Sequence, residues 1–113
     1  MNANTRKRLE QILMFAIRIQ RVMKSTSLDK FLSNEDIQDA VLYRLGQIGE
    51  EASKIPDEEQ ERYPELFWDG MIGLRHRLFH EYCDINLSRV YDITQQPTNS
   101  LIDELNTILS NNH

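Results

Sequence analysis

Residues 5–24 decide the fold, and they read TRKRLEQILMFAIRIQRVMK. In an α-helix, where each residue turns the chain by about 100°, this stretch separates into an apolar face and a basic face. The apolar positions are Leu9, Ile12, Leu13, Ala16, Ile19 and Met23, and the basic positions are Arg6, Lys7, Arg18, Arg21 and Lys24. Such a pattern is typical of an amphipathic helix with one buried side.

The same pattern recurs along the rest of the chain. Further helices are expected over residues 35–54, 67–82, 87–93 and 98–109. Ser33 or Asn34 is expected to cap the second helix, Asp84 or Asn86 the fourth, and Pro97 is expected to kink or end the fourth. We therefore expect an all-α fold, an up-down bundle of four to five helices, in a single domain spanning residues 1–113.

Details of packing also follow from the pattern. Gly46 and Gly49, three apart in the second helix, predict that another helix crosses closely there. Residues 25–32 read as a connector, with Phe31 and Leu32 turned inward. Residues 56–61 form an acidic break that is expected to be solvated and to hold one short helical turn.

Charge and composition exclude several classes of protein. The net charge is −5, which argues against a general nucleic-acid coat, yet residues 1–24 carry six basic side chains against one acidic. This basic stripe is either the wet face of a helix or a surface for RNA or a partner. Cys83, the one cysteine, cannot form an internal disulfide, and no stretch has the length of a membrane span or the core of a secretory signal. A reducing cytoplasm is the expected location.

The chemistry concentrates in residues 75–82, which read RHRLFHEY. Two of the three histidines, His76 and His80, lie here beside Arg75 and Arg77, and the third, His113, ends the chain and is expected to be disordered. Trp68, Met71, Ile72, Leu74, Leu78, Phe79 and Tyr82 define the apolar arc of this helix. Arg75 falls inside that arc, and a buried arginine is costly unless an anion meets it.

Several kinds of site fit this cluster. A histidine can move a proton near neutral pH, and an arginine can bind phosphate, so the two together suffice to cleave RNA without a metal. A structural pair of Arg75 with a carboxylate would explain the arginine equally well. His76 and His80, one helical turn apart, can also hold zinc, but no third ligand lies nearby, and neither metal nor cofactor is expected.

Arg75 and His80 are five residues apart and therefore about 140° apart around a regular helix. They would not normally meet across one straight helix. Either the helix ends at His80, or Arg75 reaches along the axis, or a second subunit completes the site. A symmetric dimer is attractive because a two-fold axis brings the same patch together twice.

The spacing Arg75-x4-His80-x-Tyr82 in a small helical chain resembles the motif of HepT-like toxins in the HEPN superfamily. The resemblance extends to the segment LGQIGEEA at residues 45–52 and to the approach to the motif, Tyr63-Pro64-Glu65 with Trp68 and residues 72–75. Asp84-Ile85 and the helix after it also match. Most of residues 35–109 is covered, and the flanking segments make the signal far more specific than the Arg–His pair alone.

The resemblance implies a metal-independent endoribonuclease that cleaves tRNA or mRNA by attack of the 2′-hydroxyl. It implies the toxin of a type VII HEPN/MNT toxin–antitoxin system, acting as a homodimer. Arg75 and His80 would be the catalytic pair, with His76 and Arg77 in supporting places. Tyr82 would receive AMP from the partner, a minimal nucleotidyltransferase antitoxin. His76 departs from the family, in which Asn often follows the motif arginine.

Two classes of function stay open. The first is the ribonuclease toxin, and the second is a non-catalytic subunit that presents a nucleotide or another substrate to a nucleotidyltransferase. Both use Arg75, but only the first needs His80 as a proton carrier.

Overall fold

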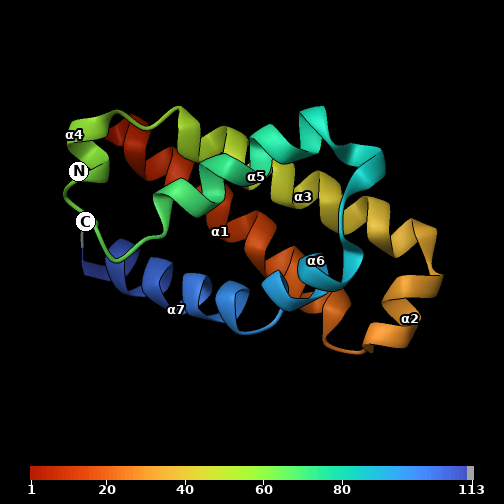
Figure 1. Cartoon of the computed structure of the whole chain (residues 1–113). Helices are drawn as coiled ribbons and strands as arrows, with labels where there is room; N and C mark the ends of the chain where they lie inside the picture. Colours follow the sequence, from red (N-terminus) through yellow and green to blue (C-terminus); the bar gives the residue numbers. More distant parts are fainter. Residues whose placement is uncertain (112–113) are drawn as a thin grey trace.

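Four long helices that run alternately up and down form the body of the protein (Figure 1). The computed structural model describes residues 1–111, and no strand occurs among them. The long helices are α1 (Ala3–Met23), α3 (Glu35–Ser53), α5 (Trp68–His80) and α7 (Gln96–Asn111). The connections hold α2 (Leu28–Ser33), α4 (Asp57–Gln60), the 3-10 turn η1 (Tyr82–Asp84) and α6 (Leu87–Ile93). The predicted all-α bundle is therefore confirmed, and the expectation for His113 lies outside the described residues.

The helices pack with neighbours that run in opposite directions. α1 lies between α3 and α7, and α3 also packs along α5 (Figure 1). Near one end, Nη1 of Arg8 on α1 is 2.9 Å from Oε2 of Glu51 on α3. On the other side of α1, the Gln20 amide donates to Oδ1 of Asn99 on α7 at 2.9 Å. The Arg6 guanidinium donates to the carbonyl of Leu109, so the two ends of the described chain lie together.

Local sequence explains where most helices begin. The Oδ1 atoms of Asn2, Asn34 and Asn86 accept backbone N–H groups in the first turns of α1, α3 and α6. Each such cap contributes about 1 kcal/mol by satisfying a donor that the helix leaves free. Of the alternatives open in the sequence, Asn34 and Asn86 are the caps.

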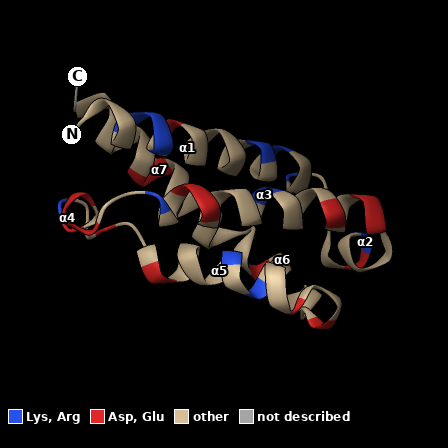
Figure 2. Cartoon of the chain, turned by 90° about the horizontal axis from the view of Figure 1, so that it is seen from above, with Lys and Arg blue, Asp and Glu red and all other residues tan. Residues whose placement is uncertain are grey.

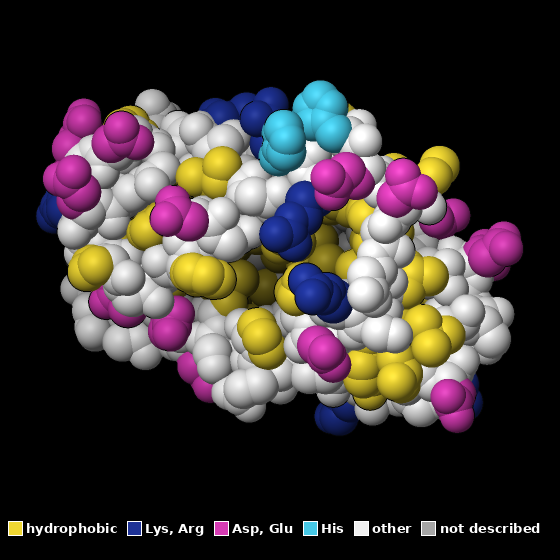
Figure 3. Space-filling model, viewed as in Figure 1, with side chains coloured by type: hydrophobic (Ala, Val, Ile, Leu, Met, Phe, Trp, Pro, Cys, Tyr) yellow, Lys and Arg dark blue, Asp and Glu magenta, His cyan; other side chains and the backbone are white. Residues whose placement is uncertain are grey.

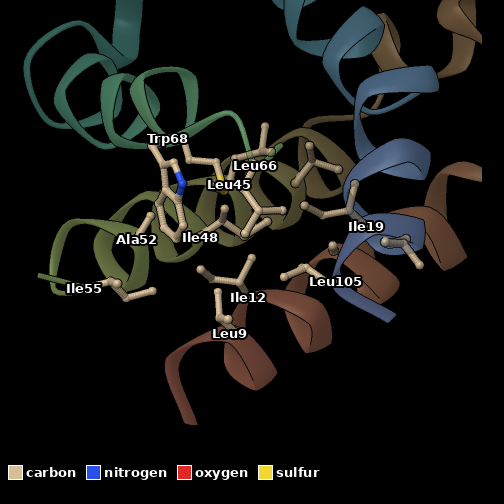
Figure 4. Close-up of a cluster of buried hydrophobic side chains, with 14 of the residues drawn as sticks. Leu9, Ile12, Ile19, Leu45, Ile48, Ala52, Ile55, Leu66, Trp68 and Leu105 are labelled. Atoms are coloured by element: carbon tan, nitrogen blue, oxygen red, sulfur yellow. The ribbon is translucent and has the colours of Figure 1, made fainter. Parts of the chain in front are cut away.

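The core fills the space where α1, α3 and α7 meet. Leu9, Ile12 and Ile19 of α1 face Leu45 and Ile48 of α3, and all are at most 3% exposed (Figure 4). The Trp68 ring lies over the same cluster, and its indole N–H donates to the carbonyl of Tyr63 at 2.9 Å. This bond satisfies the one polar atom of a buried ring and holds the start of α5 against α3.

The close crossing that the glycines predicted lies between α3 and α5. A methyl group at Gly49 would come within 2.5 Å of the carbonyl oxygen of Met71 and 2.9 Å of the amide nitrogen of Arg75. At Gly46 it would meet only a side-chain methyl of Leu78, at 3.2 Å. Gly49 therefore allows the two backbones to touch, and this contact fixes the position of Arg75.

We expect Gly49→Ala to destabilise the protein by about 1–3 kcal/mol, even though alanine favours a helix, because backbone atoms cannot give way easily. Gly73→Ala is the matched control on α5, since nothing lies within 4 Å of its missing methyl. That variant should be more stable by about 0.5–1 kcal/mol. Urea denaturation of both variants measures their free energies of unfolding. If Gly49→Ala were as stable as Gly73→Ala, the close crossing of α3 and α5 would be contradicted.

Four local expectations were wrong. The connector over residues 25–32 contains helix α2, in which Phe31 is fully buried but Leu32 is 43% exposed. Leu32 points about 100° away from Phe31 around the helix, and on the short helix α2 this direction meets solvent. Pro97 neither kinks nor ends a helix, because it lies in the first turn of α7, where its missing N–H has no partner to lose.

The acidic segment is also less solvated than expected. It does hold one short helix, α4, but Glu59 within it is only 6% exposed. Its carboxylate accepts the backbone N–H of Asn2 and an N–H of Arg62, both at 3.1 Å. The Asn2 N–H, helped by Arg62, outweighs burial and lowers the pKa of Glu59. This carboxylate therefore ties α4 to the start of α1.

The third predicted helix is shorter than expected and ends at His80. Glu81 leaves the helical region with φ −132° and ψ 25°, so Tyr82 begins the turn η1 instead of closing α5. Viewed from above, Lys and Arg gather on α1, whereas Asp and Glu dominate α4 and the two ends of α3 (Figure 2). Within residues 1–111, no helix is both long and apolar enough to cross a membrane.

Candidate functional site

The last turns of α5 carry the candidate site. Taking Arg75 as the origin, a regular helix places Phe79 at about 40°, His76 at about 100° and His80 at about 140° around the axis. All four side chains are exposed, whereas Leu78, on the side toward α3, is half-buried. The four residues therefore share one solvent-facing arc, which we call the Arg–His arc.

Arg75 is not buried but does pair with a carboxylate, which is one of the alternatives that the sequence left open. Its Nε donates to Oε2 of Glu50 on α3, and Oε1 of Glu50 is 3.4 Å from Nζ of Lys54. Burial acts to raise the pKa of Glu50, but the bond and charge of Arg75, with Lys54, outweigh it and lower that pKa. The Arg75 side chain remains 44% exposed. Among the described contacts, no hydrogen bond engages Nη1 or Nη2 of Arg75, so this end of the guanidinium faces solvent.

Phe79 lies one turn beyond Arg75 and was expected in the apolar arc of the helix. The structure overturns this, because Phe79 is 73% exposed. The Arg75 guanidinium carbon lies 5.7 Å from the centre of its ring, a cation–π distance. The ring is exposed because none of the helices within residues 1–111 covers the side of α5 that faces away from α3 and α7.

His76 and His80 lie together, as expected for residues one turn apart. Their ring centres are 4.5 Å apart and the rings are tilted by 45°. Both are exposed, and in Figure 3 the histidine side chains form a small cluster on the surface. Within the described chain, no hydrogen bond or ring contact joins Arg75 to His80, in agreement with their angular separation. Of the sequence-predicted residues, His76 and His80 thus contact each other, whereas Arg75 contacts Glu50 and Phe79 instead.

Tyr82 lies beside α3 at the end of the motif. It is 47% exposed, which corrects its assignment to the apolar arc. The reason is that α5 ends at His80, so the direction of the Tyr82 side chain is not set by the 100° turn per residue of a helix. The Tyr82 hydroxyl donates to Oδ1 of Asp39 at 2.7 Å, and this hydrogen bond, with burial and the Asp39 charge, raises the pKa of Tyr82.

Arg77 is placed differently from the other motif residues. It lies at the rim of a groove of about 530 Å³ between α5 and α7, together with Leu74 and Leu101. Figure 3 shows a hollow lined by hydrophobic side chains on this face. Within residues 1–111, no group of three or more His, Cys, Asp or Glu side chains is arranged to hold a metal ion.

The sequence reasoning missed two acidic residues on α3, Glu50 and Asp39, which receive the two key side chains of the motif. A signal for Glu50 was present, because it follows Gly49, the residue that predicted the close crossing. Asp39 gave no comparable signal. It lies two helical turns before Gly46, and its contact depends on where η1 returns to α3.

Comparison with known proteins places this chain in a family. The chain is 34% identical over 83 residues to a putative RNase of Methanocaldococcus jannaschii, covering 74% of this chain and 69% of that protein. It is 28% identical over 91 residues to a putative RNase of Caldanaerobacter subterraneus, covering 80% of each chain. A probable ribonuclease HepT of Thermococcus cleftensis is 26% identical over 83 residues, 74% of this chain and 76% of that one.

No solved structure matches the chain. The family model described as ribonuclease HepT-like matches residues 12–108, which include α3, α5, most of α1 and α7, and the whole of the Arg–His arc. The chain therefore belongs to the HepT-like ribonuclease family of the HEPN superfamily.

Proposed function

We propose that this protein is an endoribonuclease that cleaves RNA without a metal ion. The observation that carries the proposal is the exposed Arg–His arc, which lies within the residues that the ribonuclease family model matches. Arg75 offers a guanidinium end toward solvent, and His80 offers an imidazole one and a half turns further along the same helix. These are the two groups that a phosphate and a ribose hydroxyl require.

The reaction follows from these groups. A neutral imidazole at His80 takes the proton of a ribose 2′-hydroxyl, and the 2′-oxygen attacks the adjacent phosphorus. The bond from phosphorus to the 5′-oxygen breaks, and that oxygen takes up a proton. The products are a 2′,3′-cyclic phosphate and a 5′-hydroxyl. Arg75 stabilises the charge that develops on the phosphate, because its free N–H groups form charge-assisted hydrogen bonds.

The neighbours of the pair have supporting places in this scheme. Glu50 holds the Nε side of Arg75 and so aims Nη1 and Nη2 outward. His76, with its ring centre 4.5 Å from that of His80, is placed to carry the second proton, the one that the 5′-oxygen receives. Arg77, at the rim of the groove, adds positive charge for the RNA backbone. A homodimer in which the two arcs face one cleft would bring a second copy of Arg75 and His80 to the same RNA.

We further propose that the protein is the toxin of a type VII HEPN/MNT pair. Its antitoxin would be a minimal nucleotidyltransferase that modifies Tyr82. The phenol oxygen attacks the α-phosphorus of ATP, pyrophosphate leaves, and the phenol proton is released. Tyr82 is 47% exposed, which supports access by a partner enzyme. The added nucleotide places bulk and a negative charge two residues from His80, which repels the RNA phosphate.

The purified protein, freed of metal and kept in chelator, is expected to cleave a single-stranded RNA and to leave 2′,3′-cyclic phosphate ends. An oligonucleotide with one ribose replaced by deoxyribose should resist cleavage at that position alone. Mass spectrometry of the fragments identifies the ends. If the RNA stays intact while the protein binds nucleotides, the non-catalytic subunit of a nucleotidyltransferase becomes the better interpretation.

A further inference from the structure

Phe79 is an exposed aromatic ring in the middle of charged and polar side chains. It is 73% exposed, and on the helical wheel it lies between Arg75 and the His76–His80 pair. Leaving so large an apolar side chain in water forgoes the free energy that its burial would release. A ring in this position therefore has a surface available for a ligand that is itself flat and partly apolar.

We propose that the Phe79 ring is the platform on which an unpaired base of the RNA stacks beside the cleaved phosphate. This makes single-stranded RNA the substrate class, and it rests on the ribonuclease function proposed above. Single-stranded RNA is commonly held by stacking its splayed bases on aromatic side chains. Paired bases offer no free face to such a ring, because each is already stacked inside the duplex.

The geometry links the ring to the reacting groups. One turn of helix, about 5.4 Å, separates Phe79 from Arg75, and the guanidinium carbon lies 5.7 Å from the ring centre. When a base stacks on the exposed face of Phe79, the RNA backbone attached to it therefore lies near Arg75 on one side of the ring and near His80 on the other. The ring would select where the backbone is cut by holding the base next to it.

A protein partner explains the same exposure less well. The cores of protein interfaces are depleted in charged residues, whereas Phe79 is surrounded by Arg75, His76 and His80, all exposed. Covering the ring with a protein surface would bury these ionisable groups together with it. An RNA strand instead offers phosphates to the cations and a base to the ring, so each neighbour of Phe79 finds a suitable contact.

The test measures binding without cleavage. The probe is a fluorescent single-stranded RNA with 2′-O-methyl groups at every ribose, which cannot be cut by 2′-hydroxyl attack. Phe79→Leu and Phe79→Ala are expected to raise its Kd by about 5- to 150-fold, the range for loss of one stacked base, and Phe79→Trp should bind as well as wild type. For the same RNA in a duplex, wild type and Phe79→Leu should not differ.

Phe67→Leu is the matched control, because Phe67 is as exposed, at 77%, but lies at the other end of α5. It should bind the probe as wild type does. Normal binding by Phe79→Leu overturns the proposal, as does a loss of affinity that light scattering traces to a change in oligomeric state. A protein that binds through Phe79 but does not cut ordinary RNA contradicts only the ribonuclease function, so the two failures are distinguishable.

Discussion

Replacing His80 by alanine is expected to lower the rate of RNA cleavage by about 10²–10⁴-fold, the range for loss of a general acid or base. The reason is that the 2′-hydroxyl then has no imidazole to take its proton, while Arg75, held by Glu50, still binds phosphate as before. The effect should appear in kcat, with little change in KM, because proton transfer occurs only in the reaction step. Single-turnover cleavage of a labelled RNA measures it.

His76→Ala is the variant to compare with it, since it removes the other member of the His76–His80 pair. If His80 takes the 2′-hydroxyl proton and His76 supplies the second, both variants lose activity, but they differ in how the cleavage rate depends on pH. Both histidines are exposed, so neither substitution should change the free energy of unfolding by more than about 0.5 kcal/mol. Cleavage by folded His80→Ala at the wild-type rate would remove His80 from the mechanism.

The second large effect is expected for Tyr82→Phe in cells that also produce the antitoxin. The variant should still cleave RNA and arrest growth, because the hydroxyl takes no part in cleavage, but it cannot accept AMP. Wild-type protein made with the antitoxin should gain the mass of one or more AMP units, and Tyr82→Phe should gain none. Growth curves and intact-mass measurements on the same cultures compare the two directly.

Tyr43→Phe provides a matched control, because Tyr43 is an even more exposed tyrosine, at 63%, on the neighbouring helix α3. It should be modified and neutralised normally. Tyr82→Phe also loses the hydrogen bond to Asp39, which contributes about 0.5–1.5 kcal/mol at most at this partly exposed position. Normal neutralisation of Tyr82→Phe would exclude Tyr82 as the modified residue.

Most helices of this protein could be predicted because their causes are local. The apolar spacing in residues 5–24 and the cap at Asn34 lie within the segments they organise, and α1 and α3 begin and end within two residues of the predicted bounds. The contact at Gly49 was predictable for a similar reason, since a residue without a side chain allows another helix to approach closely. The motif residues were also identified from spacing and resemblance.

The sequence by itself thus determined the helices, the close crossing at Gly49 and the choice of residues 75–82 as the candidate site. Only the tertiary structure decided which of these side chains are exposed to solvent and which bind a carboxylate. Helical angles place Phe79 and Tyr82 relative to Arg75, but exposure depends on whether another helix covers that side of α5, and none of the described helices does. The partners Glu50 and Asp39 lie 25 and 43 residues away along the chain, so their contacts exist only once α3 and α5 have packed.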